Sequence, residues 1–60
     1  MTKFERGNRV KVPWPEWQAG EIGTIADVYM TAYENLYVVN VNGEKYTYHE
    51  YELTKETNNE

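Results

Sequence analysis

An Asn-Gly pair at residues 42–43 stands between two runs that favour extended backbone, Leu36–Val41 and Glu44–Tyr48. Both turn residues tolerate positive φ, so the pair predicts a type I′ turn between two antiparallel strands. With no cysteine, the chain has no disulfide staple, and a 60-residue chain buries only about 60% of its unfolded surface. Because aromatic side chains bury large areas, the 15% aromatic content suits one small β-rich core.

The segment before this hairpin alternates between apolar and charged residues and then breaks. Val10 and Val12 alternate with Arg9 and Lys11, which is the period of a strand buried on one face. Residues 13–20 contain two prolines and a glycine, so they predict a loop that ends this first strand.

The next run, Glu21–Met30, predicts a long second strand. Its apolar residues Ile25 and Val28 are three positions apart, so one bulge between them is needed to turn both side chains inward. Gly23 indicates a bend in the same strand. A short helix over Ile25–Ala32 is the alternative, although its β-branched residues favour extended backbone.

The end of the chain predicts a short closing unit, with a one-turn 3₁₀ helix at residues 49–52 and a last strand at 53–55. The fold class is therefore all-β, a five-stranded SH3-like antiparallel barrel, because closing the sheet protects the strand edges of a small chain. Residues 1–55 form this single domain, and residues 56–60 are expected to form a flexible polar tail. The predicted core is Val10, Val12, Ile22, Ile25, Val28, Tyr37, Val39, Val41, Tyr48 and Leu53.

The turn and core motifs resemble those of KOW-type and related bacterial SH3-like barrels. Residues 7–12 carry the motif G-x-x-V-x-V, residues 20–25 carry G-x-x-G-T-I, and residues 50–53 are similar to the closing turn. The layout is also similar to that of the small photosystem I subunit with an SH3-like fold. The resemblance covers residues 6–55 and implies this fold, and for KOW modules it implies binding to RNA or to ribosomal and transcription proteins. The chain differs from KOW modules in being acidic, and it lacks the A-L-Y-D-Y stretch of signalling SH3 domains.

Charge is segregated along the chain, whose net charge is −4. Residues 1–12 carry +3, residues 13–35 carry −4 and residues 36–60 carry −3. The pattern is either a basic edge on an acidic body or the ordinary mixing of opposite charges between neighbouring strands. Net acidity disfavours nonspecific nucleic-acid binding, in which phosphate neutralisation supplies most of the affinity.

The sequence shows no pattern typical of catalysis or of a cofactor site. It has neither Ser nor Cys and one histidine, His49, which excludes serine triads and thiolate metal sites. Glu50 and Glu52 would share a face in extended backbone and resemble an acid–base pair, but a solvated turn is the simpler interpretation. We expect no enzyme activity, no cofactor and no metal.

An aromatic surface is the best functional candidate. Trp14 and Trp17 lie beside prolines in the predicted loop, where they either cap the open end of the barrel or join three tyrosines in a contact surface. The candidate partner-binding residues are Trp14, Trp17, Tyr29, Tyr33 and Tyr51. The candidate nucleic-acid contacts are Lys3, Arg6, Arg9 and Lys11, which would add phosphate contacts to base stacking on the aromatic rings.

These observations favour a small noncatalytic protein-interaction or regulatory module. The alternatives are a KOW-like nucleic-acid-binding barrel and a phage-borne acidic inhibitor that imitates nucleic acid to block a host or defence protein. No apolar run approaches the roughly 18 residues of a membrane span, and no signal-peptide pattern is visible, so we expect a cytoplasmic bacterial or phage protein. We expect a protein partner, no membrane contact, and a monomer or weak homodimer.

Overall fold

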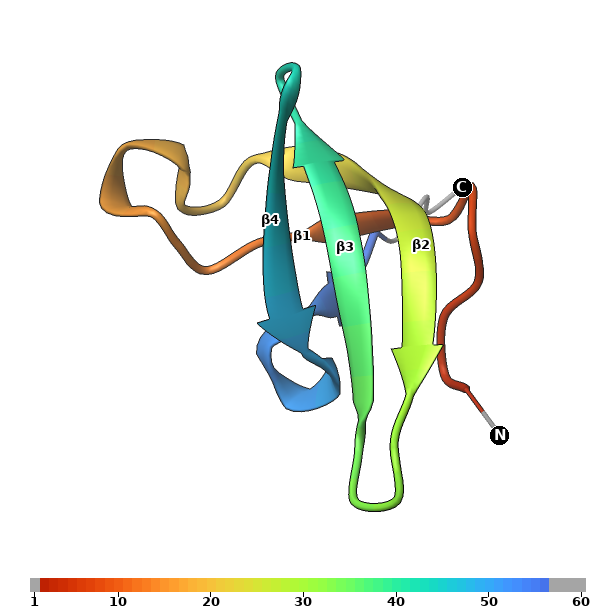
Figure 1. The fold of residues 1–60 in the computed structure, drawn as a ribbon. Helices are drawn as coiled ribbons and strands as arrows, with labels where there is room; N and C mark the ends of the chain where they lie inside the picture. Colours follow the sequence, from red (N-terminus) through yellow and green to blue (C-terminus); the bar gives the residue numbers. More distant parts are fainter. Residues whose placement is uncertain (1, 57–60) are drawn as a thin grey trace.

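The computed structural model describes residues 2–56, which form five strands and two 3₁₀ turns. The strands are β1 (Arg9–Lys11), β2 (Ile22–Met30), β3 (Asn35–Val41), β4 (Glu44–His49) and β5 (Thr54–Lys55), and the 3₁₀ turns are η1 (Glu16–Gln18) and η2 (Glu50–Glu52). All pairings are antiparallel, in the order β4-β3-β2-β1-β5 (Figure 1). The predicted all-β class and the 3₁₀ turn before the last strand are confirmed. The alternative helix over residues 25–32 is wrong, because most of this segment pairs with β3 as part of β2.

The predicted barrel is present as a curved sheet rather than as a closed one. Strands β4 and β5 lie at opposite ends of the strand order, so no ladder joins them within residues 2–56. β1 crosses behind β3 and β4, which folds the sheet over on itself (Figure 1). This arrangement is compatible with a small β-barrel, and it encloses one core between the two halves of the sheet.

Local backbone features agree with the sequence expectations. Asn42 and Gly43 have φ values of 52° and 89°, as a type I′ turn between β3 and β4 requires. The β2–β3 register shifts between Ile25 and Asp27, which is the predicted bulge. Gly23 is buried, and a Cβ built there would lie 2.6 Å from a side-chain carbon of Val39. This position therefore needs glycine because two strands approach each other closely.

The buried core confirms most of the predicted residues and corrects the list at three positions. It comprises Phe4, Val10, Val12, Ile25, Tyr37, Val39, Val41, Tyr48 and Leu53. Ile22 is only half-buried, because the register places it opposite Lys11, whose side chain lies on the outer face of β1. Val28 is also half-buried, although it packs against the core.

Phe4, which lies before the first strand, is the core residue that the sequence pattern missed. Its ring is 1% exposed and contacts the Tyr37 ring edge-on, with 5.4 Å between centroids. The Tyr37 hydroxyl accepts hydrogen bonds from the backbone amides of Lys3 and Phe4. The segment before β1 is therefore bonded to Tyr37 of β3 and to Ile25 of β2, and its Phe4 ring completes the core.

The predicted polar tail begins at Glu56, whose backbone amide donates a hydrogen bond to the carbonyl oxygen of Arg9. Residues 57–60, the rest of the predicted tail, lie outside the described residues.

Candidate interaction surface

Six large hydrophobic side chains are exposed in the described part of the chain: Trp14, Trp17, Tyr29, Met30, Tyr33 and Tyr51. Five of them are the aromatic residues that the sequence singled out. Met30 was missed, because a methionine at the end of a strand carries no signal that separates core from surface. Contiguous exposed apolar side chains are a mark of interaction sites, so their arrangement decides what they can do together.

Two of these side chains, Tyr29 and Tyr51, are brought into one row by strand register and ring stacking. Tyr29 of β2 pairs with Leu36 of β3, and Leu36 pairs with His49 of β4, so the three side chains are neighbours on the outer face of the sheet. The His49 ring stacks on Tyr51 of η2, with centroids 5.3 Å apart and planes 14° apart. We call this row of Tyr29, Leu36, His49 and Tyr51 the outer strip.

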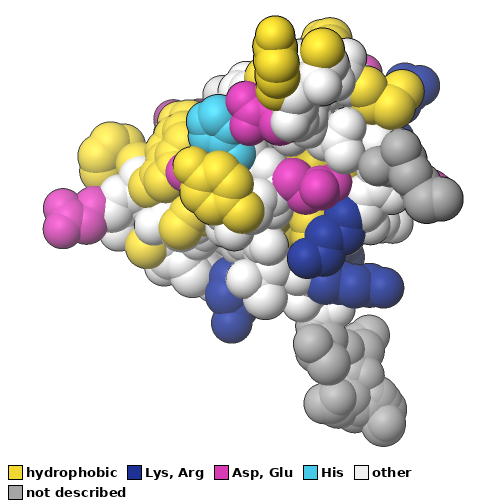
Figure 2. Space-filling model, turned by 90° about the horizontal axis from the view of Figure 1, so that it is seen from below, with side chains coloured by type: hydrophobic (Ala, Val, Ile, Leu, Met, Phe, Trp, Pro, Cys, Tyr) yellow, Lys and Arg dark blue, Asp and Glu magenta, His cyan; other side chains and the backbone are white. Residues whose placement is uncertain are grey.

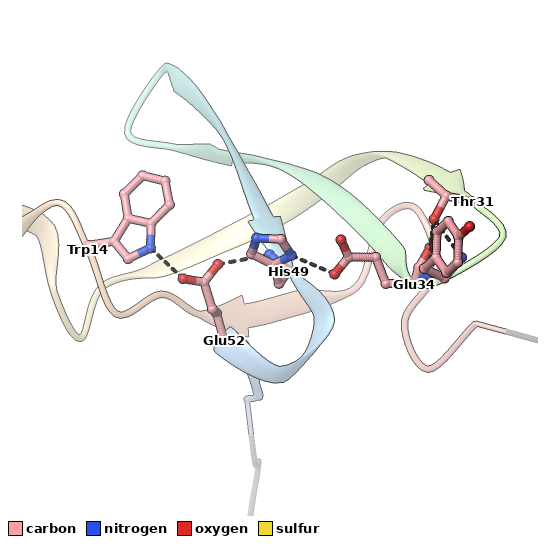
Figure 3. Close-up of polar contacts among 6 residues, drawn as sticks. Trp14, Thr31, Glu34, His49 and Glu52 are labelled. Carbon is pink, nitrogen blue, oxygen red and sulfur yellow. Dashed lines mark hydrogen bonds and ion pairs between the residues drawn. The ribbon is translucent and has the colours of Figure 1, made fainter.

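The β2–β3 turn borders the outer strip and is held by its own hydrogen bonds. The Thr31 hydroxyl donates to the Glu34 carbonyl oxygen at 2.8 Å and accepts from the Tyr33 and Glu34 backbone amides. The Glu34 carboxylate reaches back to the strip, where Oε1 lies 2.6 Å from His49 Nδ1 (Figure 3). This ordered turn presents Tyr33 to solvent with 95% of its surface exposed.

Glu52 links the other side of the strip to the loop before β2. Its Oε1 accepts from the His49 backbone amide at 2.8 Å, as in a capping box, in which the third residue of the helical turn bonds back to the residue before it. Its Oε2 accepts from Trp14 Nε1 at 2.9 Å (Figure 3). One carboxylate therefore ties the 13–20 loop to the end of β4.

The two tryptophans have different environments. The Trp14 ring packs on Tyr48 at 4.4 Å between centroids and on Tyr46 edge-on, and its carbonyl oxygen accepts from the Tyr48 hydroxyl. Burial raises the pKa of Tyr48 to about 12, with further contributions from Tyr46 and Glu52. Trp14 thus covers the end of the core, whereas Trp17 is 77% exposed on η1 in the projecting loop (Figure 1).

Glu50 has a structural environment that sequence reasoning did not anticipate. Its Oε2 accepts from the Tyr37 hydroxyl, the Lys3 backbone amide and the Asn35 side-chain amide. These hydrogen bonds lower the pKa of Glu50, and the bond from Tyr37 has the largest effect. Burial, followed by the bond to Glu50, raises the pKa of Tyr37. Glu50 and Glu52 therefore have separate sets of partners, and Glu50 holds the N-terminal segment against η2.

The four predicted nucleic-acid contacts do not form one cluster with the aromatic residues. Arg9 and Lys11 lie on the outer face of β1, and Arg9 Nε is 2.7 Å from Glu56 Oε1. Lys3 Nζ lies 5.6 Å from the Phe4 ring centroid, and Arg6 is exposed in the turn before β1. Cross-strand pairing places Arg9, Thr24, Asn40 and Lys45 side by side on four neighbouring strands. These residues form a polar row that is separate from the outer strip.

Comparison with protein-family models found no matching family, and comparisons with curated proteins and with solved structures found no match. The described residues contain no group of three or more His, Cys, Asp or Glu side chains able to hold a metal ion. The part of the chain that the structure describes, residues 2–56, encloses no cavity. Residues 2–56 contain no helix with the length and apolar character needed to cross a membrane.

Proposed function

We propose that this chain is a small noncatalytic protein-interaction module that contacts its partner through the outer strip and Tyr33. The observation that carries this proposal is the exposure of Tyr51, at 82%, beside a stacked His49 and an ordered turn that exposes Tyr33. Such side chains contribute little to the core of the chain itself. Tyrosine is among the residues that most often dominate binding energy at protein interfaces.

The fold assigned in this proposal is an SH3-like small barrel. The strand order β4-β3-β2-β1-β5 and the single 3₁₀ turn between β4 and β5 support it. The motifs at residues 7–12 and 20–25 also support it, since they form β1 and the glycine-containing start of β2. A barrel of this kind presents loops and short turns at its ends while the sheet stays rigid.

Affinity capture with the full chain and its variants tests the proposed function. Tyr51→Ala and Tyr33→Ala remove exposed rings, so each is expected to lose partner capture while the melting temperature stays within a few degrees of the wild type. Thr47→Ala, an exposed position on β4, is the matched control. Capture that both tyrosine variants retain contradicts the proposal, and so does a loss of capture that occurs only together with unfolding.

The KOW-like nucleic-acid function is the second candidate, and the polar row from Arg9 to Lys45 favours it. Its test is binding of single-stranded RNA at low salt, which is expected to fall steeply with added salt and to weaken in Arg6→Ala and Lys11→Ala. Binding that is absent or insensitive to both substitutions excludes this candidate. The acidic-inhibitor alternative is supported by the net charge of −4 alone.

A further inference from the structure

We infer that the segment recognised by the outer strip is cationic, namely a peptide segment of a partner protein that bears Arg or Lys side chains. This inference rests on the proposed interaction function and names the chemistry of its partner. Carboxylates border the strip, and tyrosine ring faces within and beside it are open to solvent.

Carboxylates border the strip on each side. Glu34 lies against His49 at the β2–β3 turn, and Glu52 lies at the other side between the His49 backbone and Trp14 (Figure 3). At the end of the strip formed by β2, the Tyr29 hydroxyl donates to Asp27 Oδ2 at 3.5 Å. The strip itself contains no Lys or Arg, so acidic groups dominate the charge around it.

The Lys and Arg side chains of the described residues lie elsewhere. In Figure 2 the histidine is flanked by hydrophobic and acidic side chains, while the Lys and Arg side chains in view lie apart from it. Lys3 contacts Glu50 through its backbone amide, but its ammonium group lies over the Phe4 ring, 5.6 Å from the centroid. Among the described residues, no Lys or Arg side chain pairs with this acidic border, in which Glu34 lies against His49.

The ring faces supply the second part of the site. His49 covers one face of the Tyr51 ring, and with 82% of Tyr51 exposed the opposite face is open to solvent. The Tyr33 ring is exposed almost completely on the neighbouring turn. An Arg or Lys side chain is attracted to an open tyrosine face by the ring quadrupole and to a nearby carboxylate by charge.

The same geometry disfavours an anionic occupant. A phosphate or an acidic peptide placed on Tyr51 would approach both Glu34 and Glu52, and like charges placed together at an interface suppress binding. Exposed nucleobases can stack on the same rings, so a single-stranded oligonucleotide is the competing outcome of the test.

The experiment is an NMR titration of the ¹⁵N-labelled full chain with short Gly/Ser peptides that differ only in carrying Arg, Gln or Glu. The Arg peptide is expected to shift the amide resonances of Tyr29, Glu34, His49 and Tyr51, and to bind more weakly at about 0.3 M salt. Tyr51→Ala and Glu34→Gln are each expected to weaken its binding about twofold to fivefold. Tyr51→Phe keeps the ring and is expected to bind nearly as the wild type does. Glu21→Gln, an exposed acid on the β1 side, is the matched control and is expected to leave binding unchanged.

Several results would overturn the cationic inference. They are equal binding of the Arg and Gln peptides, tighter binding of the Glu peptide, shifts that map away from the strip, and stronger binding of a single-stranded oligothymidylate to the strip. Equal binding of the Arg and Gln peptides at the strip removes the cationic preference but leaves the interaction function standing. If none of the three peptides shifts any resonance, the cationic inference fails, and the capture experiment with Tyr51→Ala and Tyr33→Ala decides the proposed function separately.

Discussion

Truncation of Phe4 should destabilise this domain more than its position outside every strand suggests. The ring is 1% exposed and packs edge-on against Tyr37. Burying a phenylalanine removes roughly 150–250 Å² from water, which at about 25 cal/mol per Å² corresponds to about 4–6 kcal/mol. Alanine keeps part of that burial and the site relaxes, so the expected loss in free energy of unfolding for Phe4→Ala is about 3–5 kcal/mol.

This loss is comparable with the total stability of the domain. At about 0.05–0.15 kcal/mol per residue, a chain of this length has a free energy of unfolding of about 3–9 kcal/mol. The Phe4→Ala variant is therefore expected to be largely unfolded at 25 °C, or close to the midpoint of its unfolding transition. Urea unfolding followed by circular dichroism measures the change as a shift in midpoint at constant slope.

Two further variants keep the Phe4 prediction testable. Phe4→Leu retains most of the apolar volume and is expected to lose about 1 kcal/mol, which is measurable even if Phe4→Ala does not fold. Trp17→Ala removes an aromatic ring that is 77% exposed and is expected to change stability by less than about 0.5 kcal/mol. If Phe4→Ala and Trp17→Ala unfold at the same urea concentration, the N-terminal segment is not part of the core and the reasoning is refuted.

Three other predictions concern single side chains. Gly23→Ala is expected to cost roughly 1–3 kcal/mol, because the added Cβ would lie 2.6 Å from Val39 and 2.9 Å from a backbone oxygen, and an unchanged melting temperature would contradict this. Hydrogen bonds, of which that from Tyr37 is the largest cause, lower the pKa of Glu50 in the folded state. The ionised carboxylate therefore contributes to the stability of the fold above pH 4.5, and this contribution is lost as the pH falls through the lower folded pKa. Glu50→Gln should therefore be less stable than the wild type near neutral pH, with a smaller loss of stability on acidification, and parallel acid-unfolding curves would oppose this. Burial raises the pKa of Tyr48 to about 12, so an alkaline absorbance titration of Tyr48→Phe should lack the component that ionises last.

The local elements of the fold were predictable because their causes are local. The Asn42–Gly43 turn follows from the tolerance of both residues for positive φ, and the structure confirms it. The bulge before Val28 follows from counting apolar positions in a strand whose side chains alternate with period two. The alternation of Val10 with Arg9 and Lys11 likewise predicted the buried and exposed faces of β1.

The candidate surface was predictable only as a set of residue types. Sequence reasoning named Tyr29, Tyr33 and Tyr51, but the cross-strand register and the stacked His49 are what place Tyr29 and Tyr51 in one row. It treated the two tryptophans alike, whereas packing against Tyr48 places Trp14 partly within the fold. The environment of Trp14 depends on Tyr48, a partner 34 residues away in the chain.

The sequence by itself determined the β class, the turn positions and the apolar face of most strands, since these follow from backbone preference and short-range periodicity. Only the tertiary structure decided that Phe4 is core, that Ile22 faces outward opposite Lys11, and that Glu50 holds the N-terminal segment. The physical reason is that burial and hydrogen bonding at these positions arise between segments distant in sequence. The periodic pattern of one segment does not indicate which distant segment packs against it.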